Sequence, residues 1–134
     1  MVLAALRDPT LDAAFGVRPA TFRHDFGVRA DLAADALAAL TPALPMAWIY
    51  AHLAQSSPLE GRGAEPVIDC TRTSEYLREL PTADVSIRVY NLERTAEYAD
   101  LVNTVEPLVR DFVGDREGGL AALNLGMFAA SPIA

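Results

Sequence analysis

Cysteine, clustered basic residues and long apolar runs are what this 134-residue sequence has least of. A single thiol, Cys70, excludes an internal disulfide and a zinc-finger pattern, and it fits a reducing compartment. The sequence has 11 basic and 18 acidic residues, and the net charge of −7 argues against a nucleic acid or an anionic membrane as partner. The amino terminus has no positive leader and no apolar run of signal-peptide length, so we expect a cytoplasmic protein.

The composition that remains is typical of a soluble globular chain, with 51% apolar and 22% charged residues. The length allows one domain or less. Short apolar patches interrupted by Pro9, Gly16 and Pro19 predict that residues 1–25 form an N-terminal arm lying across a neighbouring surface. Residues 26–134 are then the α+β part of the chain.

The best-patterned stretch begins with a strand at residues 85–90. Its side chains alternate, with Val85, Ile87 and Val89 on one face and Ser86, Arg88 and Tyr90 on the other. Such period-two alternation is typical of a strand with one buried face. Residues 91–95 then turn the chain towards a helix.

That helix is predicted from Tyr98 to Phe112. Its apolar stripe comprises Tyr98, Leu101, Val102, Val105, Leu108, Val109 and Phe112, while Glu97, Asp100, Arg110 and Asp111 are left for water. Pro107 predicts a kink, or two coaxial pieces, because proline lacks the amide donor and clashes with the preceding turn. Gly114 is the expected stop.

Four weaker patterns complete the expected order of elements. They are an alanine-rich helix at 31–40 (stripe Leu32, Ala36, Leu37 and Leu40) ended by Thr41-Pro42, a strand at 47–53 apolar on both faces, a helix capped by Thr73 and closed by Pro81, and a strand at 124–130. Residues 55–66 read as a loop. The strand at 47–53 is expected to be covered on both sides rather than to lie at a solvent-facing edge.

Several short strings, in this order, carry a resemblance to a known family. They are Phe22-Arg23-His24-Asp25-Phe26, residues 48–57, residues 74–80 leading into 85–90, Asn91-Leu92-Glu93-Arg94 with Glu97-Tyr98, and Met127-Phe128-Ala129-Ala130-Ser131-Pro132. Together they resemble the N-terminal part of bacterial cupin-like proteins of the JmjC type. These are relatives of the Fe(II)- and 2-oxoglutarate-dependent oxygenases and are often labelled transcriptional regulators.

The resemblance implies an incomplete cupin-like (double-stranded β-helix) front part with about three strands and packing helices. In such proteins a strand bearing His-x-Asp follows the Ser-Pro end, and with a later His it forms the facial triad that holds iron. This sequence ends before that point and contains no His-x-Asp, so no metal-ligand residue is carried over. Fe(II) and 2-oxoglutarate are implied only for full-length relatives, and no cofactor is expected in this chain.

Candidate chemical groups are few, and each has a simpler structural interpretation. His24 with Asp25, His52 and Asp69-Cys70 are the only groups that could build a metal site, but their spacing forces no convergence. Cys70 has only Arg72 as a basic neighbour, so an inert thiol is favoured. Trp48 and Tyr50 are expected in the core, and the loop Glu60-Gly61-Arg62-Gly63 lacks the pattern of a phosphate-binding loop. Ser57 and Ser131 have no His arranged to activate them. The acidic Asp111, Asp115 and Glu117 are expected to form a solvated helix end.

We therefore expect no catalytic, cofactor-binding or metal residue in this chain, and two functions stay open. One is the N-terminal part of a JmjC-type oxygenase-like protein, catalytically silent as written. The other is a small interaction module that pairs with itself or with another subunit through an exposed sheet edge. A protein partner or self-association is expected in either case.

Overall fold

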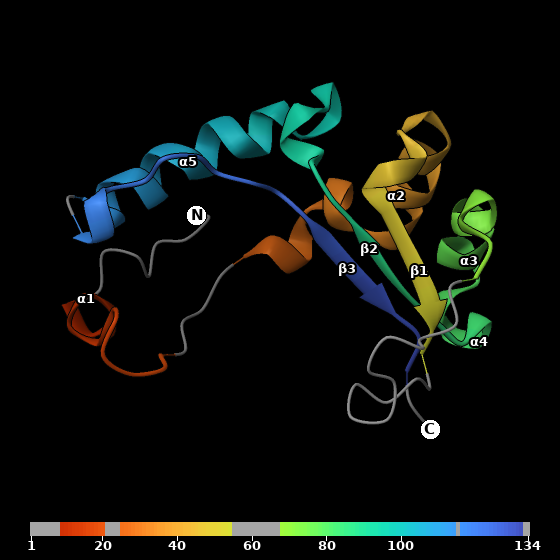
Figure 1. Ribbon diagram of the computed structural model, residues 1–134, viewed down its shortest axis with the longest axis horizontal. Coiled ribbons are helices and arrows are strands. Elements are labelled where there is room, and N and C mark those ends of the chain that lie inside the picture. Colours follow the sequence, from red (N-terminus) through yellow and green to blue (C-terminus); the bar gives the residue numbers. More distant parts are fainter. Residues whose placement is uncertain (1–8, 21–24, 55–67, 115, 133–134) are drawn as a thin grey trace. The chain divides into compact units, whose positions relative to one another are not determined.

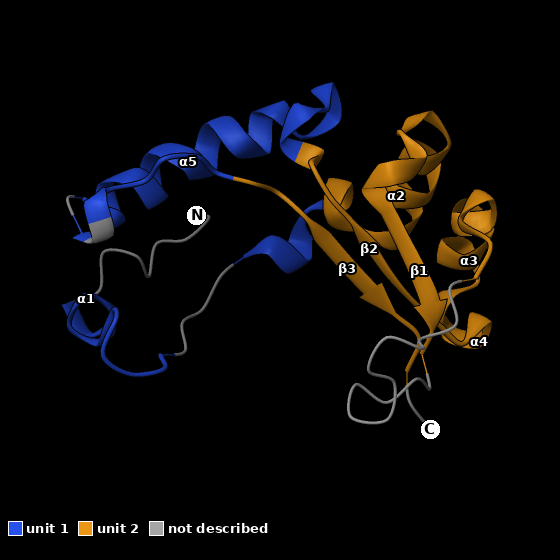
Figure 2. Ribbon diagram, viewed as in Figure 1, with its two compact units in different colours: residues 1–29, 93–123 blue, residues 30–92, 124–134 orange. Residues whose placement is uncertain are grey.

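The computed structural model describes residues 9–20, 25–54, 68–114 and 116–132. The chain groups into two compact units (Figure 2): unit 1 is residues 1–29 with 93–123, and unit 2 is residues 30–92 with 124–134. The expected division into an arm of residues 1–25 and a domain of residues 26–134 stays a prediction.

Unit 2 contains a three-stranded antiparallel sheet (Figure 1). The strands are β1 (Ile49–Leu53), β2 (Val85–Val89) and β3 (Met127–Ala130), in the order β1-β2-β3. Ile87 of β2 lies opposite Ala51 of β1 and Ala129 of β3. The predicted α+β class with three strands is confirmed at this coarse level.

The two faces of the sheet differ as the alternation of β2 predicts. Val85, Ile87 and Val89 are each 1% exposed or less, together with Ala51 of β1. On the opposite face, Tyr50 is 47% exposed and Phe128 is 64% exposed. Among the described residues, the apolar core of unit 2 lies on the face of Val85, Ile87 and Val89, while His52 is buried on the opposite face.

Strand β1 corrects one expectation. It was predicted to be covered on both faces and not to lie at a solvent-facing edge, yet it is one of the two outer strands of the described sheet. Tyr50 and Leu53 are exposed, while His52, on the same face as Tyr50, is buried. The apolar character of Tyr50 misled the prediction, because a tyrosine ring can lie on a sheet surface with its hydroxyl in water.

Three short helices, α2 (Ala34–Leu40), α3 (Thr73–Arg78) and α4 (Leu80–Ala83), belong to the same unit. Leu37 and Ala38 of α2 and Leu77 of α3 are buried, and the Ser74 hydroxyl donates to the Ala38 carbonyl at 2.7 Å. Helix α2 begins three residues later than the predicted range, since a 3-10 turn precedes it.

The predicted cap of α3 is wrong. The Thr73 hydroxyl donates to the Cys70 carbonyl at 2.7 Å, and the capping interaction lies one turn earlier, where the Asp69 carboxylate accepts from the Thr71 amide at 3.0 Å. Pro81 does not end α3 either. It lies in the first turn of α4, where the backbone amide that proline lacks would have no partner within the helix.

Unit 1 contains α1 (Pro9–Ala14) and the long helix α5 (Ala99–Val113). Helix α5 runs uninterrupted through Pro107, so the alternative of two separate pieces is wrong. Leu101 is buried at 3% exposure and the rest of the predicted stripe within α5 is half-buried, while Gly114 ends the helix with φ +54°.

Short 3-10 turns connect these elements at Phe26–Val28, Ala30–Leu32, Thr41–Ala43, Met46–Trp48, Cys70–Arg72, Leu92–Arg94, Ala96–Tyr98 and Arg116–Gly118. Among the helices in the described ranges, none combines the length and the apolar character needed to cross a membrane.

Candidate functional site

Some of the predicted candidate residues lie outside the described ranges. These are His24, Ser57, Asp115 and the loop Glu60-Gly61-Arg62-Gly63. The side chain of Glu117 is also not described. The structure places the other candidates, and it brings none of these together as a catalytic group.

His52 lies on β1 and is 5% exposed, with its ring edge-on to Tyr50 at a centroid distance of 4.4 Å. Across the ranges that the structure covers, no group of three or more His, Cys, Asp or Glu side chains is arranged to hold a metal ion. An iron site needs two imidazoles and a carboxylate that converge. The described residues therefore do not fit iron, and no step of oxygenase chemistry is derived from them.

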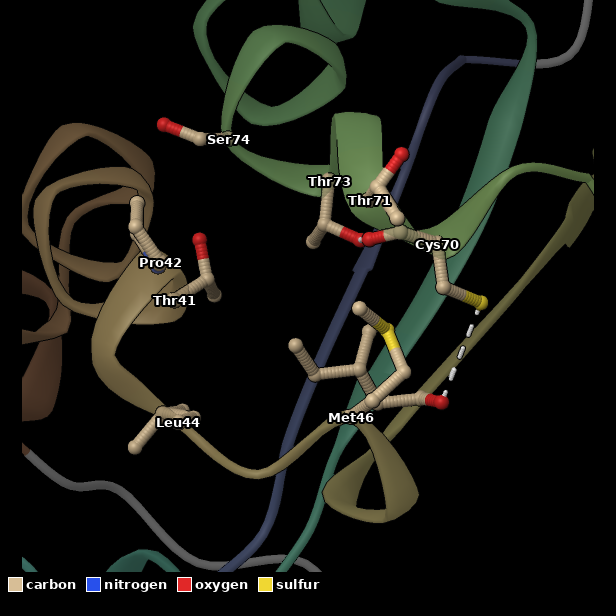
Figure 3. A pocket seen from close by; sticks show the side chains of 9 residues that line it. Thr41, Pro42, Leu44, Met46, Cys70, Thr71, Thr73 and Ser74 are labelled. Atoms are coloured by element: carbon tan, nitrogen blue, oxygen red, sulfur yellow. Dashed lines mark hydrogen bonds between the residues drawn. The ribbon is translucent and has the colours of Figure 1, made fainter.

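Cys70 borders a pocket of about 270 Å³ in unit 2 (Figure 3). The pocket is lined by Thr41, Pro42, Leu44, Met46, Ile49, Cys70, Thr71, Thr73 and Ser74. The hydroxyls of Thr41, Thr73 and Ser74 donate to backbone carbonyls. The Cys70 thiol lies 3.9 Å from the Ile49 carbonyl oxygen and 3.6 Å from that of Ile68, so the polar donors of this pocket serve the fold.

Asp69, beside Cys70, is held by the same turn. The Thr71 hydroxyl donates to its carboxylate at 2.6 Å and the Thr71 amide at 3.0 Å, and these bonds, in that order, lower the pKa of Asp69. These bonds make Asp69 a turn-forming group that begins the 3-10 turn Cys70–Arg72.

Ser131 has a structural role that its sequence context did not predict. It is 4% exposed, and its amide donates to the Val85 carbonyl at 2.8 Å. Its hydroxyl accepts from the Val85 amide at 3.0 Å and donates to the Leu80 carbonyl. The side chain therefore continues the β2–β3 ladder where a backbone carbonyl usually stands, and it joins β3 to α4.

The hydrogen-bond pattern shows which backbone groups of the sheet point outward. Bonds from the Tyr90 amide to the Trp48 carbonyl (2.8 Å) and from the Ala54 amide to the Asp84 carbonyl (3.0 Å) direct the even-numbered residues of β2 towards β1. The bond from the Ser131 amide to the Val85 carbonyl directs the odd-numbered ones towards β3. Because an antiparallel ladder alternates, the backbone groups of Phe128 and Ala130 point away from β2.

The two outer edges of the sheet differ in their hydrogen bonding to the rest of the chain. On β1, the Ala51 carbonyl accepts from the Ile68 amide at 3.2 Å, and Cys70 lies against the Ile49 carbonyl. In the part of the chain that the structure describes, β3 pairs with β2 alone. Strand β3 also carries no charge, bulge or proline of the kind that protects native edge strands.

Beside that edge lies a cross-strand row of three side chains on the exposed face. Tyr50, Arg88 and Phe128 are direct partners across β1, β2 and β3, and the Arg88 guanidinium carbon lies 5.7 Å from the centroid of the Phe128 ring. Sequence patterns predicted the faces of β2 but not this row, which depends on the register of three strands. The outer edge of β3, with Phe128 and Ala130, is the best candidate functional surface of unit 2.

Comparison of the chain with family models, with curated proteins and with solved structures gives no match.

Proposed function

We propose that this chain is the front part of a cupin-like protein of the JmjC type and acts as a scaffold layer whose sheet is extended at β3. The observation that carries the proposal is that, among the described residues, β3 pairs with β2 alone, on a sheet with an apolar buried face and Tyr50 and Phe128 exposed on the other. A double-stranded β-helix is built by adding antiparallel strands to such a layer.

The order of the elements supports this proposal. A strand at 49–53, a short helix at 73–78 and a strand at 85–89 are followed by the long helix and by a strand that ends at Ser131-Pro132. The three strands lie within the family-like strings at residues 48–57, 85–90 and 127–132, and the short helix overlaps the string at residues 74–80. Ser131 is buried in this arrangement, so the Ser-Pro end has a structural reason to be there.

In this proposal the chain itself is catalytically silent. Full-length relatives use Fe(II) and 2-oxoglutarate, but His52 is the one histidine in the described ranges, and the residues around it do not fit iron. The contribution of this chain is to hold the sheet against α2 and α3 and to offer β3 for strand addition.

The DNA that follows codon 134 tests the proposal. A reading frame that continues and encodes His-x-Asp within a few codons is the expected result. A stop codon at that position contradicts the proposal and leaves the interaction module.

A second candidate function is that of an interaction module, in which β3 pairs with a second copy or with another subunit. Its specific support is Phe128, which is 64% exposed on an uncharged edge strand. Four residues of strand form only a small contact, so we expect self-association that depends on protein concentration.

Light scattering over a range of protein concentrations tests this second function. Phe128→Lys should shift the equilibrium towards the monomer, because it places a charge on the edge strand. Tyr50→Lys is the matched control, since Tyr50 is exposed on the same face but belongs to the strand whose outer edge is already bonded. A wild-type monomer at all concentrations contradicts self-association.

A further inference from the structure

Helix α1 is held against the C-terminal end of α5 by contacts within unit 1 that share one side chain, Arg116. Arg116 forms an ion pair with Asp12. Its guanidinium carbon lies 5.4 Å from the ring centroid of Phe15 and 5.5 Å from that of Phe112. The two rings also meet edge-to-face, with centroids 5.1 Å apart.

Helix α1 is short and has a small apolar contact in the part of the chain that the structure describes. The helix has six residues, and isolated helices shorter than about 12 residues are marginal in water, so its structure depends on packing. Ala14 is its one buried residue, which leaves a small apolar contact. Residues that are ordered mainly by a few surface contacts open more readily than the core of a protein.

The contacts of Arg116 with Asp12, Phe15 and Phe112, which we call the latch, are accessible to dissolved salt. The side chain of Asp12 is 55% exposed and that of Arg116 is 37% exposed, so dissolved ions screen the pair. Within the described structure, the Nη1 atom of Arg116 is buried and has no hydrogen-bond partner. The guanidinium is therefore held by the ring faces and one carboxylate rather than by a network of hydrogen bonds.

We propose that α1 is a salt-releasable strap that Arg116 latches onto the end of α5. Loss of the latch frees residues 9–18 while the strands of unit 2 stay folded. The chain thus contains a switchable segment, and ionic strength sets the population of its open state.

Hydrogen–deuterium exchange of the full chain tests the strap. The amides of Phe15, Val17 and Arg18, bonded at 3.1, 3.0 and 3.0 Å, report on α1, and the peptide that contains β2 is the internal reference. Raising the salt from about 0.02 M to about 0.5 M shortens the screening length several-fold. We expect exchange in residues 9–18 to become about two- to fivefold faster, with β2 unchanged.

Four variants identify the latch. Arg116→Gln should reproduce the fast exchange at low salt, and Arg116→Lys should restore part of the protection because it keeps the charge. Asp12→Asn should remove the salt dependence and keep the ring contacts. Arg110→Gln is the matched control, since Arg110 bonds the Leu120 carbonyl and Glu106 but not α1.

Two results would overturn the proposal. One is exchange in residues 9–18 that responds neither to salt nor to Arg116→Gln. The other is exchange that rises equally in β2, which would mean that the whole chain unfolds.

Discussion

The hydroxyl of Ser131 gives the sharpest stability prediction, because one oxygen serves two backbone groups far away in the sequence. It accepts from the Val85 amide and donates to the Leu80 carbonyl. Ser131→Ala removes both bonds and adds no bulk. Val85 is 1% exposed, so its amide is then buried without an acceptor. Leu80 is only half-buried, so its carbonyl is easier to satisfy.

The magnitude follows mainly from that amide. An unsatisfied buried donor costs about 1–3 kcal/mol, so we expect Ser131→Ala to lower the free energy of unfolding by about 2 kcal/mol. At roughly 4 °C per kcal/mol for a chain of this size, the melting temperature should fall by about 8 °C. The β3 strand should also pair less tightly, because Ser131 lies at its end.

Urea denaturation followed by circular dichroism measures the change, with an unaltered slope expected if only stability has changed. Thr104→Ala is the control, since its hydroxyl donates to the Asp100 carbonyl at 2.9 Å on an exposed helix surface. That variant should change stability by about 0.5 kcal/mol or less. If Ser131→Ala loses no more than Thr104→Ala, the reasoning about the ladder is refuted.

The remaining predictions concern the core, the metal and the thiol. Leu101→Ala should cost about 2–5 kcal/mol because Leu101 is 3% exposed, while the exposed Asp100→Ala should cost about 0.5 kcal/mol or less; equal melting temperatures would contradict the assigned helix face. Untagged protein titrated with Fe(II) under argon should bind no stoichiometric iron, and tight binding lost on His24→Ala or His52→Ala would contradict this. Iodoacetamide should alkylate Cys70 more slowly in the folded chain than in urea, since its thiol lies against β1; equal rates would contradict that placement.

Local patterns predicted the elements whose structure depends on local residues. The alternation of Val85, Ile87 and Val89 gave the buried face of β2 correctly, because a strand with one covered face has period two. The stripe along α5 and its stop at Gly114 were also correct. Of the two alternatives at Pro107, the one with two separate pieces is wrong because α5 continues through the proline, while the kink stays a prediction.

The cap of α3 was misplaced because two signals compete within one turn. Thr73 is a good N-cap residue, but Asp69 forms the stronger local bonds with Thr71 and begins the turn earlier. Propensity alone does not decide between two candidate caps four residues apart.

The contacts that define the candidate surfaces could not be predicted from local patterns. Ser131 meets Leu80 across 51 residues and Val85 across 46, and Arg116 meets Asp12 across 104. The row formed by Tyr50, Arg88 and Phe128 likewise requires the register of three strands. Such contacts are set by tertiary packing, on which a local pattern carries no information.

The open outer edge of β3 is the claim on which both proposed functions depend, and amide exchange in a dilute sample tests it most directly. The Ala129 amide points towards β2, whereas those of Phe128 and Ala130 point outward. We predict slow exchange at Ala129 and fast exchange at Phe128 and Ala130. Equally slow exchange at all three amides would mean that the edge is already covered, and it would contradict both functions.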